Sequence, residues 1–119
     1  MKLAKRVAIV TGGATGIGRA TALALARSKI AGVVINYRSA KDQAEELAEE
    51  ISQLGAEPLC IYADMTNDKE VRAMIEQAGN HFGRLDVLIN NAGITHWVPF
   101  SDLESLTDEI WDQILDVNV

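Results

Sequence analysis

The sequence contains a single cysteine among its 119 residues. One thiol has no partner for an internal disulfide, and such a chain fits a reducing compartment. Cys60 lies in a short apolar run, so we expect it to be a small packing residue rather than a reactive thiol. The expected location of the protein is therefore the cytoplasm.

Long apolar runs are also missing. Near the N-terminus the apolar run "VAIV" covers only Val7–Val10, which is shorter than the roughly 7–15 residues of a signal-peptide core. No other stretch approaches the roughly 20 apolar residues that a membrane-spanning helix needs. The sequence therefore predicts neither a signal peptide nor a membrane partner.

Positive charge is scarce, with 11 lysines and arginines against 17 aspartates and glutamates and a net charge of −6. A partner with a phosphate backbone requires clustered positive side chains, so the composition argues against nucleic-acid binding. His81 and His96 have no Cys, Asp or Glu at metal-ligand spacing, and no metal site is predicted.

Short apolar runs alternate regularly with longer amphipathic stretches. The four apolar runs predict strands at 7–11, 32–37, 58–64 and 85–93. The amphipathic stretches predict helices at 19–29, 40–55, 68–83 and 107–118, the last with Thr107 in position to cap its first turn. A loop is expected from residue 94 to about residue 105.

This alternation predicts the fold class. Strands that are apolar nearly throughout are typical of a parallel sheet whose two faces are both covered by helices. Right-handed crossovers then favour an α/β fold with a Rossmann-type doubly wound sheet, here ending after the fourth strand and the helix that follows it. Residues 1–119 are expected to form one domain of this type.

Two of the predicted helices carry an apolar stripe at helical spacing. In the second helix the stripe consists of Ala44, Leu47, Ile51 and Leu54, and Gly55 is the expected stop signal. In the third helix the stripe consists of Val71, Met74, Ile75, Ala78 and Phe82.

A glycine-rich turn, "TGGATGIGRA", joins the first strand to the first helix. Gly12 permits a tight turn out of the strand, Gly16 allows a bound group to approach the backbone, and Gly18 lets the helix pack on the sheet. The helix N-terminus presents free N–H groups and a positive dipole end to a pyrophosphate. Because the turn stands within a complete β-α-β unit, it predicts a dinucleotide site.

The end of the second strand bears on the choice of cofactor. An acid about 20 residues beyond the glycine turn binds the ribose 2′-hydroxyl of NAD, whereas a cation there suits the 2′-phosphate of NADP. This sequence has Asn36, Tyr37, Arg38 and Ser39 at that place, with no acid. The Arg38 guanidinium matches a phosphate, and Ser39 adds a donor. NADP(H) is therefore favoured over NAD(H), the alternative being that Arg38 is an ordinary surface residue.

Four motifs in order resemble the N-terminal half of the short-chain dehydrogenase/reductase family. They are "TGGATGIG" at Thr11–Gly18, "AD" at Ala63–Asp64, "NNAG" at Asn90–Gly93 and "DVNV" at Asp116–Val119. Within that family the chain is similar to 3-oxoacyl-acyl-carrier-protein reductases and to glucose and other polyol dehydrogenases. The resemblance implies a small carbonyl or alcohol substrate, or an acyl-carrier thioester.

The resemblance also implies roles for residues on the cofactor side. Asp64 accepts a hydrogen bond from the adenine amino group, with the backbone N–H of Met65 beside it, and the adenosine ribose is lined by Asn91, Ala92 and Gly93. Similar proteins often have an arginine or lysine where this chain has Thr15, which leaves Arg38 as the main 2′-phosphate partner. The full set of expected cofactor-binding residues is Gly12, Thr15, Gly16, Ile17, Gly18, Asn36, Tyr37, Arg38, Ser39, Asp64, Met65, Asn91, Ala92 and Gly93.

The catalytic residue implied by the resemblance is Asn118, whose backbone carbonyl holds a water in a proton relay. The family's serine and its Tyr-x-x-x-Lys pair lie beyond that asparagine. The resemblance therefore implies that residues 1–119 form one dinucleotide-binding domain, incomplete at its C-terminus, which holds the cofactor half only. Tyr37 and Lys41 reproduce the Tyr-x-x-x-Lys spacing, but at the adenosine end of the site, out of reach of the reacting oxygen.

Two functions stay open on this basis. One is an oxidoreductase that transfers a hydride between NADP(H) and a carbonyl or alcohol carbon, with this chain as its cofactor half. The other is a non-catalytic dinucleotide-binding module or inactive fragment. Because the fourth strand would lack its next neighbour, we also expect an open sheet edge and a homo-oligomer formed through it.

Overall fold

A computed structural model describes residues 3–89 and 97–99 of the chain. Strands and helices alternate along these residues as far as the fourth strand, and a fifth strand follows it. In chain order the elements are β1 (Val7–Val10), α1 (Gly16–Arg27), β2 (Gly32–Tyr37), α2 (Lys41–Gln53), β3 (Glu57–Tyr62), α3 (Asp68–Phe82), β4 (Val87–Ile89) and β5 (Trp97–Pro99). The fourth helix predicted at 107–118 lies outside the described residues.

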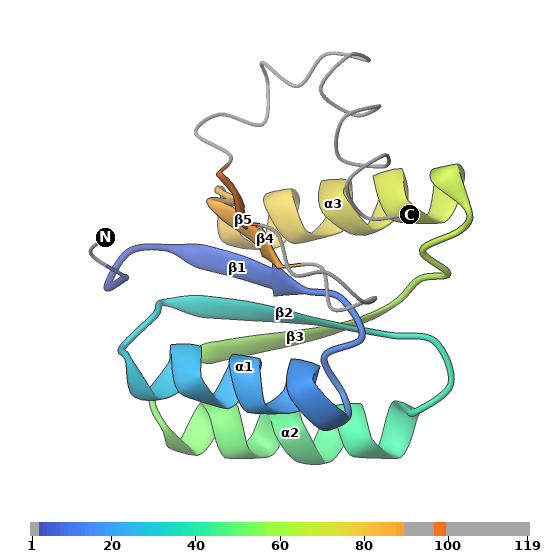
Figure 1. The fold of residues 1–119 in the computed structure, drawn as a ribbon. Coiled ribbons are helices and arrows are strands. Elements are labelled where there is room, and N and C mark those ends of the chain that lie inside the picture. The colour runs from blue at the N-terminus through green and yellow to red at the C-terminus, as the bar shows by residue number, and fades with distance from the viewer. Residues whose placement is uncertain (1–2, 90–96, 100–119) are drawn as a thin grey trace.

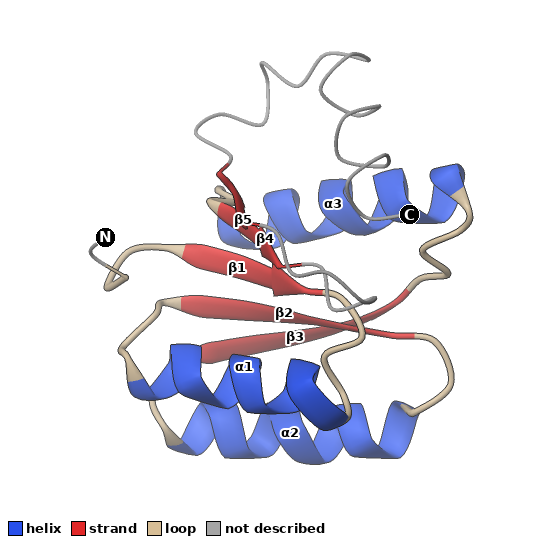
Figure 2. Cartoon of the chain, in the orientation of Figure 1, coloured by secondary structure: helices blue, strands red, loops and turns tan. Residues whose placement is uncertain are grey.

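The strands form one sheet in the order β3-β2-β1-β4-β5. The pairs β3–β2, β2–β1 and β1–β4 are parallel, and β4–β5 is antiparallel. Helices α1 and α2 lie on one face of the sheet and α3 lies on the other (Figures 1 and 2). The predicted Rossmann-type architecture, with a parallel sheet between helical layers, is confirmed. None of the described helices is long and apolar enough to cross a lipid bilayer.

The layered arrangement explains why the strands are apolar at nearly every position. In β1 the side chains of Ala8 and Val10 belong to the core under α1 and α2, whereas Val7 and Ile9 belong to the core under α3. All four are at most 2% exposed. Because successive side chains point to opposite faces, a strand covered on both faces has no polar position.

Helix α2 shows one error in the predicted stripe. Ala44, Leu47 and Ile51 are buried as expected, but Leu54 is 36% exposed. The helix ends at Gln53, and Gly55 follows with a left-handed φ of 95° that turns the chain toward β3. Helical spacing no longer applies after the last turn, so Leu54 leaves the stripe.

Helix α3 matches its predicted stripe, and both of its ends are capped. The Asn67 side chain accepts a hydrogen bond from the N–H of Glu70 at 3.2 Å, and Gly83 ends the helix in the left-handed conformation at φ 75°. The stripe residues Val71, Met74, Ile75 and Ala78 are buried, and Phe82 is partly buried against the same core.

Cys60 behaves as a packing residue of β3. It is half-buried against the core under α1 and α2, and its thiol donates a hydrogen bond to the carbonyl of Ala44 at 3.3 Å. Burial, followed by the nearby charge of Glu45, raises the pKa of the thiol and so disfavours the reactive thiolate.

The far edge of β4 differs from the prediction. Residues 97–99, expected in a loop, form β5 and pair antiparallel with β4, with Leu88 opposite Val98. An unpaired strand edge offers free N–H and C=O groups, and a following segment that satisfies them covers the edge. The predicted open edge at β4 is therefore wrong. Oligomerisation itself stays a prediction.

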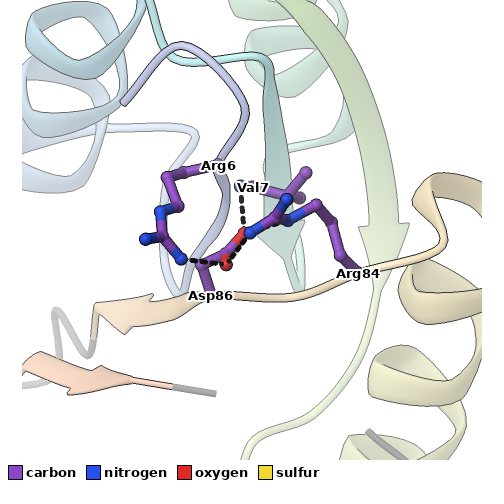
Figure 3. A network of polar contacts seen from close by, with 4 residues as sticks. All are labelled: Arg6, Val7, Arg84 and Asp86. Carbon is purple, nitrogen blue, oxygen red and sulfur yellow. Dashed lines mark hydrogen bonds and ion pairs between the residues drawn. The ribbon is translucent and has the colours of Figure 1, made fainter. Parts of the chain in front are cut away.

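A buried carboxylate joins β1 to β4 at the ends opposite the glycine turn. Asp86 is 4% exposed and accepts hydrogen bonds from Arg6 at 2.9 Å, from the N–H of Val7 at 2.8 Å and from Arg84 at 2.8 and 2.6 Å (Figure 3). Its own N–H donates to the carbonyl of Val7 at 2.9 Å. One side chain thus fixes how the two central strands begin.

The ionisation of Asp86 follows from these contacts. Burial opposes the charge, but the hydrogen bonds from Arg84, Val7 and Arg6 outweigh it and lower the pKa below its ordinary value of 3.8. The carboxylate is therefore charged and fully partnered at neutral pH.

We expect Asp86→Asn to lower the free energy of unfolding at pH 7 by about 1–3 kcal/mol, since two guanidinium groups and a buried N–H lose a charged acceptor. Urea denaturation followed by circular dichroism measures the change. Asp68→Asn is the matched control, because it removes the same charge from an exposed pair with Arg72. That control should cost less than about 1 kcal/mol.

The difference in free energy of unfolding between wild type and Asp86→Asn should also depend on pH. Because the folded-state pKa of Asp86 is depressed, its stabilisation is complete above the unfolded value of 3.8 and is lost as the pH falls through the folded value. The gap in stability between wild type and Asp86→Asn should therefore narrow below about pH 4. A gap that stays constant at lower pH would contradict this role.

Candidate functional site

The candidate site lies where β1, β2 and β3 end and the chain turns from β1 into α1. At the end of β1, the N–H and the hydroxyl of Thr11 both donate to the carbonyl of Ile89, at 3.0 and 3.3 Å. These bonds tie the start of the turn to β4. In parallel α/β sheets the carboxyl ends of the strands form the crevice in which ligands bind.

The glycines of the turn have separate structural reasons. Gly12 and Gly16 both adopt a left-handed φ of 58°, which side chains rarely tolerate. Gly13 is needed for space, since a Cβ there would lie 2.9 Å from the carbonyl oxygen of Val10. No role was predicted for Gly13 from the sequence, and its place in the short turn after a buried strand was the available signal.

Helix α1 begins without a side-chain cap. Thr15, the N-cap residue, makes no capping hydrogen bond, and no acidic residue occurs in the first turn. The first N–H groups of a helix have no acceptor within the helix, so those of Gly16, Ile17 and Gly18 are directed out of the N-terminus together with the positive dipole end. Gly18 is buried against the sheet, whereas Ile17 is 71% exposed.

Asn36 holds the turn in place from β2. It is 2% exposed, and its Oδ1 accepts from the N–H of Gly12 at 3.2 Å while its Nδ2 donates to the carbonyl of Ala63 at 3.1 Å. Its backbone carbonyl also accepts from the N–H of Gly13 at 3.1 Å. One buried side chain thus connects the glycine turn to the corner that follows β3.

Two adjoining pockets open beside Asn36. The first, of about 180 Å³, is lined by Gly12, Ala14, Thr15, Asn36, Tyr37, Arg38, Ser39 and Ala40. The second, of about 220 Å³, is lined by Thr11, Gly12, Asn36, Arg38, Ala63, Asp64, Met65 and Thr66. Gly12, Asn36 and Arg38 belong to both, so the two pockets adjoin each other around the turn.

The charges of the site are arranged around Arg38. Its guanidinium is 70% exposed and lies 3.6 Å from Oδ2 of Asp64. Hydrogen bonds from the side chain and the N–H of Thr66 lower the pKa of Asp64, burial opposes this, and the Arg38 charge adds to it. The site therefore contains an exposed cation beside a carboxylate that Thr66 holds by hydrogen bonds.

Tyr37 and Lys41 lie where the sequence analysis placed them. Tyr37 is the last residue of β2 and Lys41 is the first of α2. The Tyr37 ring packs edge-on against Tyr62, with centroids 6.1 Å apart, and borders the core under α1 and α2. Here the tyrosine serves packing and lines the first pocket.

The structure brings most of the predicted site residues together. Pocket walls include Gly12, Thr15, Asn36, Tyr37, Arg38, Ser39, Asp64 and Met65. Gly16, Ile17 and Gly18 form the adjacent first turn of α1. The predicted residues Asn91, Ala92, Gly93 and Asn118 lie outside the described residues.

A metal centre is not found among residues 3–89 and 97–99, where no three His, Cys, Asp or Glu side chains gather. His81 lies 3.6 Å from Glu57 and stacks edge-on with Phe82 at the end of α3. His96 lies outside the described residues.

The arrangement fits a phosphate-containing ligand of elongated shape. Small residues and left-handed glycines leave the backbone accessible at an uncapped helix N-terminus, which attracts anions. Arg38 offers a second positive group on the adjoining pocket, so the two adjoining pockets provide two separate phosphate positions.

Comparison with known proteins gives a consistent picture. The family model described as short chain dehydrogenase matches residues 6–119. The 3-oxoacyl-acyl-carrier-protein reductase FabG of Staphylococcus aureus is 41% identical over 119 residues, which are all of this chain and 46% of that protein. The short-chain dehydrogenase/reductase homolog YusS of Bacillus subtilis is 39% identical over 110 residues, which are 92% of this chain and all of that protein.

Among solved structures, a short chain dehydrogenase from Burkholderia cenocepacia in complex with NADP is 37% identical, with a TM-score of 0.74. The alignment covers all of this chain and 47% of that one. The chain thus spans about half the length of FabG and of the Burkholderia protein, whereas it covers the whole of YusS. With a family model matched over residues 6–119, the chain belongs to the short chain dehydrogenase family.

Proposed function

We propose that this chain is the cofactor-binding half of an oxidoreductase that transfers a hydride between NADP(H) and a carbonyl or alcohol carbon. The observation that carries the proposal is the uncapped N-terminus of α1, which opens on Gly16 beside the pockets around Gly12 and Arg38. Family membership and the likeness to FabG support the reaction class.

In this proposal each part of the site has a distinct task. The backbone amides at Gly16–Gly18 hold the pyrophosphate through the helix dipole and hydrogen bonds. Asp64 and the N–H of Met65 hold the adenine, while Asn91, Ala92 and Gly93 line its ribose. A bound nicotinamide supplies or accepts the hydride, and Asn118 positions the water that relays the proton.

The choice of NADP(H) rests on Arg38. It is exposed on the pocket, its fork of N–H donors matches a phosphate, and no acid stands at the end of β2 to bind a 2′-hydroxyl. The Burkholderia relative, whose structure contains NADP, supports the same choice. Thr15 contributes no second cation, so the clamp depends on one side chain.

The proposed substrate class is a small carbonyl or alcohol compound or an acyl-carrier thioester. Support comes from FabG, a 3-oxoacyl-acyl-carrier-protein reductase with 41% identity to this chain. A 3-oxoacyl thioester is therefore the first substrate to test with the complete protein.

A second candidate is a non-catalytic dinucleotide-binding module. The observation that favours it is the match to YusS, which this chain covers in full. In-frame codons after Val119 for a serine and a Tyr-x-x-x-Lys pair would favour the oxidoreductase. Their absence from the gene would favour the binding module.

We expect Arg38→Ala to weaken NADPH binding about tenfold and to leave NADH binding within about twofold, because only NADPH has a charged group for the guanidinium to bind. Isothermal titration calorimetry measures both dissociation constants. Arg27→Ala is the control, because Arg27 is an exposed residue in the last turn of α1, far along the helix from the pockets. It removes the same charge and should change neither dissociation constant. Equal loss of both cofactors in Arg38→Ala would contradict the phosphate clamp.

Asn36→Ala should weaken NADPH and NADH binding to the same degree, in contrast to Arg38→Ala. The substitution removes the acceptor for Gly12 and the donor to Ala63, so the turn that both cofactors share loses its position. The loss of these two hydrogen bonds should also lower the free energy of unfolding by about 1–3 kcal/mol. A change in affinity confined to one cofactor would argue against this positioning role.

The 119-residue chain should bind NADPH without oxidising it. Tyr37 and Lys41 form the only Tyr-x-x-x-Lys pair in the sequence, and both stand beside the pocket assigned to the adenosine half. Absorbance at the NADPH band, followed with a panel of carbonyl compounds, tests this. Steady NADPH oxidation by the purified chain would contradict the proposal that this chain is only the cofactor-binding half.

A further inference from the structure

The ion pair between Arg38 and Asp64 lies across the second pocket. Arg38 follows directly after β2, and Asp64 follows two residues after the end of β3. Because Tyr37 and Tyr62 are partners in the register of these strands, the residues beyond them meet at the same edge of the sheet. The guanidinium NH2 of Arg38 is 3.6 Å from Oδ2 of Asp64.

The two members of the pair differ in how firmly they are held. Oδ1 of Asp64 accepts from the N–H and the hydroxyl of Thr66, at 2.9 and 2.7 Å. The N–H of Asp64 donates to Oε1 of Glu70 at 3.3 Å, and its carbonyl accepts from the N–H of Asn67 at 2.9 Å. The Asp64 carboxylate is therefore fixed, with Oδ2 directed at Arg38.

Arg38 is held far less. Its side chain is 70% exposed, and within residues 3–89 and 97–99 its ion pair with Asp64 is its one recorded polar contact. A long exposed side chain with one weak ion pair moves readily to a better partner. A phosphate that binds Arg38 must draw the guanidinium away from Asp64 or share it with that carboxylate.

This competition affects the two cofactors differently. The 2′-phosphate of NADP(H) needs the guanidinium and is repelled by the carboxylate. The 2′-hydroxyl of NAD(H) carries no charge and needs neither. Whatever Asp64 contributes to binding the adenine is common to both cofactors, so it cancels from their ratio.

From this geometry we infer that Asp64 is a specificity-determining residue, which competes with the 2′-phosphate for Arg38 and so weakens the preference for NADP(H). The inference rests on the proposed function, because it assigns the pocket around Arg38 to the adenosine half of the cofactor. It makes the preference a balance between two residues rather than a property of Arg38 alone.

The test measures dissociation constants for two adenosine fragments, adenosine 2′,5′-bisphosphate and 5′-AMP, by calorimetry with the 119-residue chain. Asp64→Asn keeps the shape and the acceptor for Thr66 but removes the charge. The ratio of the 5′-AMP constant to the bisphosphate constant should rise about threefold to tenfold. Asp64→Ser, which also retains a short acceptor, should move the ratio the same way.

Two controls separate the ion pair from a general change of charge. Asp68→Asn removes one negative charge on the neighbouring helix, outside both pockets, and should leave the ratio unchanged. In an Arg38→Ala background, Asp64→Asn should raise the ratio clearly less than it does with Arg38 present, because no pair is left to break and only the direct repulsion between carboxylate and phosphate is relieved. An equal rise in both backgrounds would overturn competition for Arg38.

The outcome also separates this inference from the function beneath it. If the wild-type chain binds both fragments and Asp64→Asn leaves or lowers the ratio, the inference fails while dinucleotide binding stands. If the wild-type chain binds neither fragment, the proposed function fails and takes the inference with it.

Discussion

The hydrogen bonds of one buried amide, that of Asn36, determine the shape of the candidate site. The Asn36 side chain joins Gly12 to Ala63, which lie at two separate corners of the chain, and the backbone carbonyl of Asn36 also accepts from the N–H of Gly13. A buried amide that lost these partners would be costly, so the bonds specify one position for the turn. The uncapped N-terminus of α1 and the two pockets are set by that position.

The two ends of the sheet have different tasks. At one end Asp86, with Arg6, Val7 and Arg84, fixes the beginnings of β1 and β4 through a fully partnered carboxylate. At the other end glycines leave the backbone accessible. Of the charged pair there, Asp64 is held by Thr66, whereas the Arg38 side chain is exposed. The charges at the first end are satisfied within the fold, whereas at the carboxyl ends of the strands the Arg38 guanidinium is exposed and accessible to a ligand.

The sequence predicted the layered fold because its strands are buried on both faces and its helices carry apolar stripes, as Val7–Val10 and Val71 to Ala78 show. It predicted the glycine turn because glycines stand between a strand and a helix, and the structure adds that Gly12 and Gly16 are left-handed. It did not predict the hydrogen bonds around the buried Asp86 carboxylate, the close approach of Gly13 to Val10 or the ion pair of Arg38 with Asp64. Each depends on residues distant in sequence that only the folded backbone brings together, and periodicity carries no signal for them. The predictions were wrong for Leu54, at the end of a helix, and for β5, in a segment predicted to be a loop. Local sequence patterns indicate structure least well at such places.

The central claim is that the amides at the start of α1 hold the diphosphate of a nicotinamide dinucleotide. Amide proton NMR of the nitrogen-15 labelled chain, titrated with NADPH, tests this claim residue by residue. The account predicts the largest shifts at Gly16, Ile17 and Gly18, with further shifts at Gly12 and Arg38. Saturable binding that leaves those amides unmoved, or an absence of any shift at millimolar NADPH, would contradict it.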